Sequence, residues 1–505
     1  MTRARDYLLT LDAGTGSGRC VAFDAAGTPV AAAQEGFTYR VFEDPNMPFL
    51  RGFDIVPDAF WGTLARSART VVARLPAGAR IRGVIATSQR EGCVILDATG
   101  EVLYAGPNLD GRAVAEGMEV QEKVGARLHA ITGHAPPYIF PIARWLWFRK
   151  HGDASRAATL LMLNDWITFL LSGERVAEHS NACESMLFDV TRRAWSEELL
   201  DAFDIPRAVL PPVLAPGAPA GRVTAAAAAA TGIPAGTPVF VGGADTESAL
   251  LGSGVWETGE TAAILGTTSP VQMVLDRPLL DPGERLWTSC HVVPDRWVLE
   301  SNAGDTGDAY RWLLELFFGS TDAAAHAAAE TTMAATAPAP RPLFCHFGPA
   351  IFDLSNMSPF KPAGLLFRFP LMHVDRPLRG EILRAYVENV AYAIRGNCEQ
   401  LRAVSGRDIP HLTVSGGLSQ SPTLTTVLAD TLGIPLRVAD VPESASLGSA
   451  VLAAVGAGLH ATLAEAVAAM TRTRGVEPAP ERVPAYDERY RKWREVYDFL
   501  QTWTM

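Results

Sequence analysis

Residues Leu8–Asp24 read Leu-Leu-Thr-Leu-Asp-Ala-Gly-Thr-Gly-Ser-Gly-Arg-Cys-Val-Ala-Phe-Asp, and residues Ala262–Met273 read Ala-Ala-Ile-Leu-Gly-Thr-Thr-Ser-Pro-Val-Gln-Met. In each stretch an apolar strand enters a turn of Gly, Thr and Ser residues, and a second apolar strand leaves it. Such turns let backbone N–H groups and hydroxyls approach an anion, because no bulky side chain blocks the way. Two of these turns, one in each half of the chain, predict two similar lobes that hold one polyphosphate between them.

The length and composition limit the class of protein. A chain of 505 residues is too long for one hydrophobic core, so we expect two domains of about 250 residues each. We place the boundary at the Gly-Gly-Ala-Asp sequence of residues 242–245, which separates domains 1–243 and 244–505. Hydrophobic residues make up 48% of the chain and charged residues 20%, which excludes wholesale disorder. The net charge of −11 disfavours a nucleic-acid partner, which would require a basic face.

The hydrophobic patterns predict an α/β fold that begins with an antiparallel meander. We expect strands from Tyr7 and at Arg19–Asp24, Pro29–Ala33, Ile81–Ser88, Cys93–Asp97, Val239–Val241 and His411–Ser415, and helices at Ala59–Leu75, Arg144–His151, Trp166–Leu171, Leu378–Arg395 and Ser421–Leu432. The stretch Ser444–Ala464 carries no Asp, Glu, Lys or Arg, and its Ala, Gly and Ser content favours a buried helix over a membrane span.

Two further features concern the cellular compartment. The apolar run at the N-terminus ends at Asp12, which makes it too short for a signal peptide. The six cysteines are scattered without a Cys-x-x-Cys pair, so a disulfide framework or a zinc site is disfavoured. We therefore expect a cytoplasmic protein without a membrane partner. The sequence leaves the oligomeric state open, including a homodimer.

The first turn follows a carboxylate, Asp12, at the end of its strand. A carboxylate there can hold Mg²⁺, directly or through water, while the turn holds phosphate. The alternative is an Asp that only caps the turn. The residues that follow, Thr15, Gly16, Ser17 and Arg19, favour the phosphate-binding interpretation.

Asp245 lies directly after a predicted strand and two glycines. Phosphoryl transfer to an alcohol needs a group that orients the hydroxyl and accepts its proton, and an Asp commonly does this in kinases. Spacing alone slightly favours the alternative, an Asp that belongs to a glycine turn.

Two polar segments are candidates for substrate binding. Gln89, Arg90 and Glu91 lie between two apolar strands, where an Arg and a Glu side by side can hydrogen-bond several hydroxyls of a polyol. The alternative is a solvated hairpin tip. Asn108 and Asp110, in the Asn-Leu-Asp-Gly-Arg stretch, are ambiguous in the same way.

The second half of the chain supplies candidates for nucleotide binding. Gly266 and Thr267 form the second turn, and Gly416 and Gly417, followed by Gln420, lie between a strand and a helix, where an anion or nucleotide can bind. Helix packing alone would also explain the glycine pair. The chain has neither a Gly-x-x-x-x-Gly-Lys-Ser/Thr loop nor a Gly-x-Gly-x-x-Gly crossover, so P-loop and dinucleotide-binding Rossmann sites are disfavoured.

Taken together and in order, these segments resemble the FGGY family of carbohydrate kinases, within the actin-like ATPase superfamily, from about Tyr7 to about Tyr497. The segments that carry the resemblance are Leu11–Ser17 with Arg19, Pro141–Trp147, Leu163–Trp166, Leu171–Glu174, Ser180–Ala182, Gly242–Asp245, Gly266–Thr268, Leu383–Tyr392 and Val414–Gly417. The chain departs from the family pattern at Arg144, where Lys is usual, and at Thr268, where Ser is common.

The resemblance implies two ribonuclease-H-like domains with ATP and a sugar in the cleft between them. It implies that Asp245 is the general base and that Asp12 positions Mg²⁺ and phosphate. By the same resemblance, Thr15, Gly266 and Thr267 face phosphates, and Gly416, Gly417 and Gln420 face the nucleotide.

The substrate implied by the resemblance is a small sugar or polyol. Xylulokinases usually carry Met-His where this chain has Gln89-Arg90-Glu91, whereas glycerol kinases have Gln-Arg-Glu there but differ near Asn108 and around Tyr138–Pro141. Within the family the chain most resembles autoinducer-2 kinases, whose substrate is a linear five-carbon dihydroxy-dione. The matching residues are Arg90–Gly92, Asn108, Asp110, Arg112, Ile142, Arg144, Leu146 and Trp147.

Three functions therefore compete. The leading hypothesis is ATP- and Mg²⁺-dependent phosphorylation of a hydroxyl of a small sugar or polyol, for which an autoinducer-2-like dihydroxy-dione is one candidate; the alternative is a glycerol, polyol or xylulose-type ketopentose kinase. A non-catalytic actin-like ATP-binding protein is the hypothesis from another class, and a filament would have no need for Asp245 or the Gln89–Glu91 segment. A hydrolase is disfavoured, because no Gly-x-Ser-x-Gly elbow is present.

Overall fold

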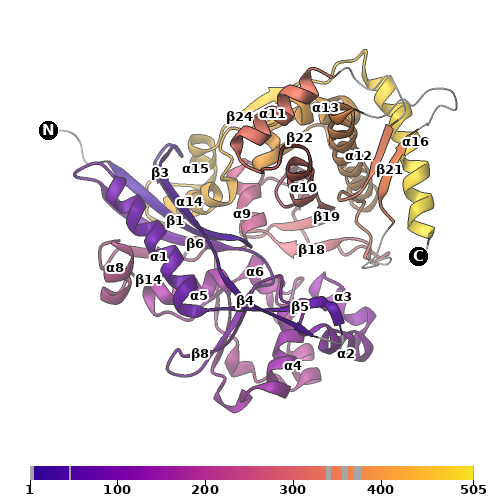
Figure 1. Ribbon diagram of the computed structural model, residues 1–505. Helices are drawn as coiled ribbons and strands as arrows, with labels where there is room; N and C mark the ends of the chain where they lie inside the picture. Colours follow the sequence, from indigo (N-terminus) through magenta and orange to yellow (C-terminus); the bar gives the residue numbers. More distant parts are fainter. Residues whose placement is uncertain (1–4, 45–46, 337–342, 355–361, 368–377, 504–505) are drawn as a thin grey trace.

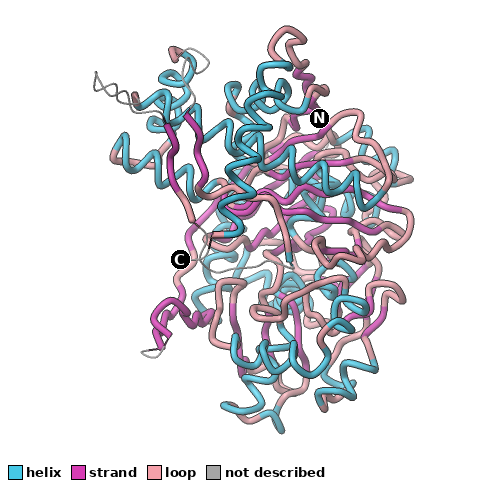
Figure 2. The backbone as a smooth tube through the Cα atoms, turned by 90° about the vertical axis from the view of Figure 1, so that its right-hand side faces the viewer, coloured by secondary structure: helices cyan, strands magenta, loops and turns pink. Residues whose placement is uncertain are grey.

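Two mixed β-sheets form the centres of two lobes, with the N-terminal lobe in the lower part of Figure 1 and most of the C-terminal half above it. The computed structural model describes residues 5–44, 47–336, 343–354, 362–367 and 378–503. Turned by 90°, the chain shows strands running through the middle of the molecule with helices on the outside (Figure 2).

The first sheet has the strand order β14-β15-β6-β1-β2-β3. Its strands are β1 (Asp6–Ala13), β2 (Ser17–Asp24), β3 (Pro29–Gly36), β6 (Arg80–Ser88), β14 (Pro219–Arg222) and β15 (Pro238–Phe240). Strands β1, β2 and β3 are antiparallel, which confirms the expected meander, and β6 and β15 run parallel to β1. Strand β14 closes the far edge antiparallel to β15.

The second sheet repeats this arrangement, with the order β18-β19-β17-β16-β22-β23-β24. Its strands are β16 (Thr261–Ile264), β17 (Thr268–Leu275), β18 (Trp287–Cys290), β19 (Trp297–Asp305), β22 (Leu412–Ser415), β23 (Leu436–Ala439) and β24 (Thr473–Val476). Again three antiparallel strands, β16, β17 and β19, are followed by two parallel ones, β22 and β23, and by an antiparallel edge strand. The predicted pair of similar α/β lobes is confirmed, and β18 is an addition to the second sheet.

The chain passes from one sheet to the other between Phe240 and Thr261. Helix α9 (Asp245–Gly252) lies in this passage and packs against α14 (Ser444–Gly456). The two helices meet at glycines: a Cβ on Gly448 would lie 1.8 Å from the Ser248 carbonyl oxygen. The division of the chain at residues 243 and 244 falls within this passage and stays a prediction.

Helices cover both faces of the first sheet. One face packs on α1 (Pro57–Arg74), α5 (Leu163–Ser172) and α8 (Ala225–Thr231). The other face packs on α14, which comes from the C-terminal half of the chain. The stretch predicted as a buried helix thus covers a sheet and ends at Gly456. Within the described residues, no helix has both the length and the apolar character that crossing a bilayer requires.

The lobes also join through the edge strand β18. The backbone N–H of Thr288 donates to the Gly133 carbonyl at 2.9 Å, and Trp287 Nε1 donates to the Ala135 carbonyl at 2.9 Å. One hydrophobic cluster continues across this contact and includes Phe140 and Cys290 from the two sides. The lobes therefore share part of their hydrophobic core on this side.

The other elements surround these sheets. They are the strands β4 (Tyr39–Asp44), β5 (Met47–Ile55), β7 (Cys93–Leu96), β8 (Val102–Gly106), β9 (Thr159–Met162), β10 (Ala177–Glu178), β11 (Phe188–Asp189), β12 (Ala194–Trp195), β13 (Val213–Leu214), β20 (Leu343–His346) and β21 (Gly364–Phe367), and the helices α2 (Val114–Val124), α3 (Ala126–Thr132), α4 (Pro141–His151), α6 (His179–Cys183), α7 (Glu197–Phe203), α10 (Gly307–Phe318), α11 (Ala323–Ala334), α12 (Arg379–Ser405), α13 (Pro422–Leu432), α15 (Leu463–Met470) and α16 (Val483–Thr502).

Helix α12 extends ten residues beyond the predicted end at Arg395. Gly396 lies inside it because Ile351 packs where a side chain would be: a Cβ there would lie 2.3 Å from the Ile351 side chain. The helix ends instead at Gly406, in the left-handed conformation that commonly terminates helices.

Candidate functional site

The predicted residues of the N-terminal half meet at one edge of the first sheet. Strands β1, β6 and β15 are parallel, so their carboxyl ends lie together. A parallel bridge between Ser88 and Ala244 brings the residues that follow each of them, Gln89 and Asp245, to the same edge as the first turn. The carboxyl ends of parallel strands are a common place for ligands in α/β proteins.

Asp12 lies at the start of this edge with its side chain 13% exposed. Its Oδ2 accepts a hydrogen bond from Ser446 Oγ at 3.3 Å and lies 4.0 Å from the guanidinium of Arg19. Burial raises the pKa of Asp12, while Arg19 opposes the rise. Among the described residues, no group of three or more His, Cys, Asp and Glu side chains forms a metal cluster.

The first turn is held by side chains from outside it. Tyr39 OH donates to the Thr15 carbonyl at 2.6 Å, and Asn108 Nδ2 donates to Thr15 Oγ1 at 3.0 Å. Gln34 Nε2 donates to Ser17 Oγ at 2.7 Å. Gly16 is exposed, and a Cβ on it would meet nothing within 4 Å. The turn is thus anchored at both sides and open at its tip.

Asp245 begins helix α9 beside this turn. Burial raises the pKa of its carboxyl to about 7, and the nearby carboxylate of Asp12 adds to the rise. Thr246 Oγ1 donates to Asp245 Oδ1 at 3.0 Å. A carboxyl with a pKa near neutrality suits a group that accepts a proton during a reaction.

The segment Gln89–Glu91 is no solvated hairpin tip, because it links a strand of the main sheet to β7 of a separate small sheet and is buried throughout. Gln89 holds the turn and the next segment together: its backbone N–H donates to the Ala13 carbonyl at 2.8 Å, and its Oε1 accepts from the Asn108 N–H at 2.8 Å. Burial raises the pKa of Glu91 to about 8. The buried Arg144, from the family-like Pro141–Trp147 segment, donates to the Glu91 carbonyl at 2.8 Å.

The structure places Asn108 and Asp110 differently. Asn108 Oδ1 is buried without a hydrogen-bond partner, which suits a side chain that awaits a donor. Asp110 is fully buried, and its carboxylate accepts from Tyr104 OH at 2.6 Å and from Arg112 Nε at 2.8 Å. In this geometry Asp110 supports the wall of the site, and a direct contact with substrate stays a prediction.

Sequence reasoning missed a cluster of charged residues around Arg90. Glu300, on β19 of the other lobe, forms a two-pronged ion pair with the Arg90 guanidinium, at 2.6 and 3.0 Å. Glu184 and Glu247 lie 3.8 and 3.9 Å from it. A signal existed in the sequence, because Glu300 interrupts the apolar strand Trp-Val-Leu-Glu of residues 297–300.

The residues predicted to bind nucleotide meet at the matching edge of the second sheet. Strands β16 and β22 are parallel, and the Leu265 N–H donates to the Ser415 carbonyl at 2.7 Å. Gly416 has φ +87°, and a Cβ on it would lie 2.6 Å from the Leu265 carbonyl oxygen, so only glycine fits. The second turn is tied to the start of α10, since the Gly307 N–H donates to the Thr267 carbonyl at 2.8 Å.

A pocket of about 630 Å³ opens at this edge. Four of the predicted residues line it, namely Gly266, Thr267, Gly417 and Gln420. Helices α10 and α11 supply further lining that the sequence had not indicated: Tyr310, Arg311, His326 and Glu330.

Two family comparisons match this architecture. Residues 7–252 match the N-terminal domain of the FGGY family of carbohydrate kinases, and residues 261–457 match its C-terminal domain. The chain belongs to the FGGY family of carbohydrate kinases.

Known proteins resemble this FGGY kinase both in sequence and in fold. An autoinducer-2 kinase from Salmonella paratyphi B is 32% identical over 512 residues, which cover 98% of this chain and 95% of that protein. The crystal structure of a xylulose kinase from Rhodospirillum rubrum superposes with a TM-score of 0.82 at 26% identity, covering 98% of this chain and 99% of that one. A glycerol kinase from Plasmodium falciparum, crystallised with ADP, superposes with a TM-score of 0.85 at 19% identity, covering 99% of each chain, which supports the fold.

As an FGGY carbohydrate kinase, the protein is a phosphotransferase with an alcohol group as acceptor, and it uses ATP to phosphorylate a sugar. The hypothesis of a non-catalytic actin-like protein is thereby displaced.

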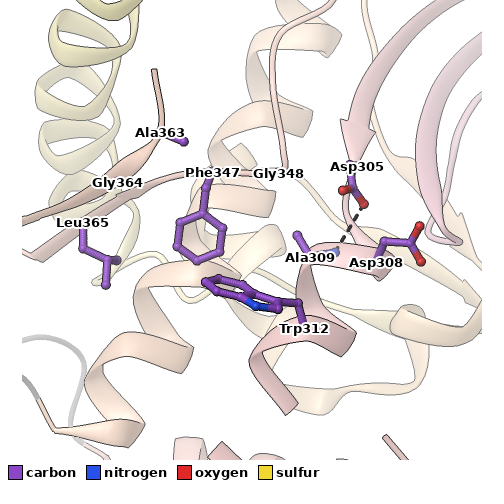
Figure 3. A pocket seen from close by; sticks show the side chains of 9 residues that line it. All are labelled: Asp305, Asp308, Ala309, Trp312, Phe347, Gly348, Ala363, Gly364 and Leu365. Carbon is purple, nitrogen blue, oxygen red and sulfur yellow. Dashed lines mark hydrogen bonds between the residues drawn. The ribbon is translucent and has the colours of Figure 1, made fainter. Parts of the chain in front are cut away.

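The kinase has a second pocket, of about 570 Å³, on the opposite face of α10 (Figure 3). Gly307, Tyr310 and Arg311 of α10 face the nucleotide pocket, whereas Asp308 and Trp312 face this one, as the helical period requires. The Trp312 and Phe347 rings meet edge to face with centroids 5.5 Å apart. No motif in the sequence indicated this pocket, and we assign it no ligand.

Proposed function

We propose that Asp245 is the general base of this kinase. The acceptor hydroxyl oxygen forms a bond to the γ-phosphorus of ATP, the bond from that phosphorus to the bridging oxygen of ADP breaks, and the hydroxyl proton passes to Asp245. The pKa of about 7 at Asp245 supports this role, because the carboxylate is then available near neutral pH yet basic enough to take the proton. Its position beside the first turn, where Asp12 also lies, is the observation that carries the proposal.

We propose that the two turns hold the phosphates from opposite lobes. In the first lobe, Thr15, Gly16, Ser17 and Arg19 provide amides, hydroxyls and one positive charge. In the second, Gly266 and Thr267 provide backbone groups and a hydroxyl. Asp12 fits Mg²⁺, since its carboxylate is partly exposed and lies at the end of β1 directly before the turn. Bound there, Mg²⁺ would neutralise charge on the transferring phosphoryl group.

The remaining predicted residues divide between the two substrates. Gly416, Gly417 and Gln420 are proposed to face the nucleotide, and the pocket beside them supports this. Five residues are proposed to face the sugar, namely Gln89, Arg90, Glu91, Asn108 and Asp110, and Gln89 also holds the backbone of Asn108 in place. The proposal divides the chain into a sugar- and phosphate-binding domain, 1–243, and a nucleotide-binding domain, 244–505. The six buried, free cysteines suit the reducing cytoplasm proposed as its location.

For the acceptor we propose a linear dihydroxy-dione like that of autoinducer-2, or a small polyol or ketopentose. The identity of 32% to an autoinducer-2 kinase over nearly the whole chain supports the first choice. The likeness to xylulose and glycerol kinases supports the others at the level of fold.

The test combines Asp245→Asn with a panel of acceptors: the dihydroxy-dione, glycerol, tetritols and ketopentoses. An Asp that only belongs to a turn would leave kcat within a few-fold, whereas a positioned base costs on the order of a hundredfold or more. ADP release is the measurement, and near-wild-type turnover by the folded variant would contradict the assignment. A matched control is Asp24→Asn, which removes a carboxylate at the far end of β2 from the turn.

A further inference from the structure

The guanidinium of Arg90 is engaged by a carboxylate of the protein itself. Its Nη1 donates to Glu300 Oε2 at 2.6 Å and its Nη2 to Glu300 Oε1 at 3.0 Å. Arg90 follows β6 of the first lobe, and Glu300 lies on β19 of the second. The pair therefore bridges the two lobes, next to Glu91 and the proposed sugar site.

Glu300 is fixed in this position. Gln272 Nε2 donates to its Oε2 at 2.8 Å, and Asn302 Nδ2 donates to its Oε1 at 3.1 Å. The Glu300 side chain is 1% exposed and that of Arg90 is 9% exposed, so the pair is almost wholly buried. With four donors, the carboxylate of Glu300 has little freedom to move away from Arg90.

The surroundings are acidic as well. Glu184 and Glu247 lie just beyond hydrogen-bond distance of Arg90, and both are fully buried. His134 Nε2 lies 3.3 Å from Glu184 Oε1. Burial raises the pKa of Glu184, but His134 and Arg90 outweigh it and lower that pKa below its usual value. An additional anion brought to Arg90 would meet Glu300 and Glu184 before it met an unpaired positive charge.

The fork of an arginine is the protein group best suited to bind a ligand carboxylate with two parallel hydrogen bonds. Here Glu300 occupies both Nη atoms from within the protein. We infer that Glu300 is a specificity-determining residue, which makes the acceptor site select uncharged polyols and ketoses and reject sugar acids. The inference rests on the proposed function, because it takes Arg90 to lie in the sugar site.

The substitution Glu300→Gln tests it, since it keeps the shape of the side chain and removes the charge. The probes are matched pairs of an alcohol and its acid: xylitol with xylonate, and glucitol with gluconate, beside the best neutral acceptor. We expect the ratio of kcat/KM for acid to kcat/KM for alcohol to rise about tenfold or more in the variant, because Arg90 gains a free charge. KM for ATP should stay within about twofold, since the nucleotide pocket is untouched.

The matched control is Glu388→Gln, which removes the carboxylate of another buried Arg–Glu pair, Arg489 with Glu388, between α12 and α16. A merely structural role for Glu300 predicts that both variants lose stability and leave the acid-to-alcohol ratio unchanged. An unchanged ratio in folded Glu300→Gln, or an equal change in Glu388→Gln, overturns the inference.

The wild-type enzyme offers a second measurement if Glu300→Gln fails to fold. Xylonate and gluconate should then inhibit turnover of the best neutral acceptor at least about tenfold more weakly than xylitol and glucitol do. Equal inhibition by acid and alcohol overturns the inference. Failure of the proposed function looks different, because an enzyme that phosphorylates no neutral acceptor contradicts that function, and calorimetric binding of the same pairs then still decides the role of Glu300.

Discussion

The proposed sugar and nucleotide sites differ in the kinds of residue that form them. At the proposed sugar end, buried charged side chains such as Arg90, Glu91 and Glu300 lie close together, and the Arg90–Glu300 pair crosses between the lobes. At the nucleotide end, the glycines Gly266 and Gly417 line the pocket, beside side chains of α10 and α11 that include Arg311 and Glu330. Both ends sit on the carboxyl ends of parallel strands in sheets of the same order.

The difference follows from what each end has to recognise. Phosphates carry their own charge, so amides and hydroxyls in a turn suffice to bind them when backbone can come close. An uncharged polyol offers only hydroxyls, and buried, fixed side chains are needed to tell one arrangement of hydroxyls from another. Activity should therefore be sensitive to different changes at the two ends. Removing a charge should matter most at the sugar end, and adding side-chain volume should matter most at the nucleotide end.

Asp12 tests this contrast, because it and Arg19 place charges beside the first phosphate turn. If it positions Mg²⁺, Asp12→Asn should lower kcat by about a hundredfold, even at saturating ATP, since removing one charge-positioning group at a reacting centre commonly has that effect. Titration of turnover with Mg²⁺ is the measurement. Ser446→Ala, which removes only a 3.3 Å hydrogen bond to Asp12, serves as the mild control, with a few-fold effect expected. If Asp12→Asn turns over within a few-fold of the parent, the magnesium role is contradicted and Asp12 only caps the turn.

The contrast also explains which parts of the site the sequence could indicate. A glycine turn between apolar strands is a local pattern, so the phosphate turns and Gly416-Gly417 are visible in a few consecutive residues. The likeness of the two lobes follows from the same local patterns, because strand and turn signals repeat in each half, whereas the order of the strands depends on their pairing in the fold. Helix ends were less accurate: Gly396 lies inside α12 for a packing reason that depends on Ile351, 45 residues away in sequence.

The charged network at the sugar end could not be predicted in this way. Arg90 and Glu300 are 210 residues apart, and only the packing of β19 against the first lobe brings them together. Asp110 reads as a free polar residue in sequence, yet Tyr104 and Arg112 occupy its carboxylate in the fold. Pairing over such distances depends on tertiary structure, which neither spacing nor composition encodes locally.

At the nucleotide end a change of shape is the sharper probe. Gly417 has room for a methyl group, since a Cβ on it would meet nothing within 4 Å, and it lines the pocket. Gly417→Ala should therefore fold normally and raise KM for ATP about three- to tenfold through contact with the nucleotide, while KM for the sugar stays within about twofold. Gly475→Ala on β24, which is equally open, is the matched control and should change neither constant. An unchanged KM for ATP in Gly417→Ala would mean that the nucleotide does not approach this residue.

Titratable groups at the sugar end should also make stability depend on pH, and Glu178 behind Asp245 allows a graded test. Glu178 Oε2 accepts a hydrogen bond from Ser180 Oγ at 2.6 Å. Ser180 Oγ in turn accepts from the backbone N–H of Ala244 at 2.9 Å, and Ala244 directly precedes the proposed base. Burial raises the pKa of Glu178 to about 7. The pKa of an unfolded Glu is about 4.3.

A folded pKa above the unfolded one means that the folded state binds the proton more tightly. The stability that Glu178 contributes is thus fully present below about pH 4 and is lost as the pH rises through about 7. In Glu178→Gln, which keeps the acceptor oxygen but cannot ionise, the loss of unfolding free energy between pH 5 and 8 should be shallower, by up to about 1.4 kcal/mol per pH unit. Denaturant unfolding across this range is the measurement. Asp245 and Glu91 have pKa values raised in the same direction, so part of the slope should remain, and an unaltered slope would show that Glu178 is not protonated in the folded protein.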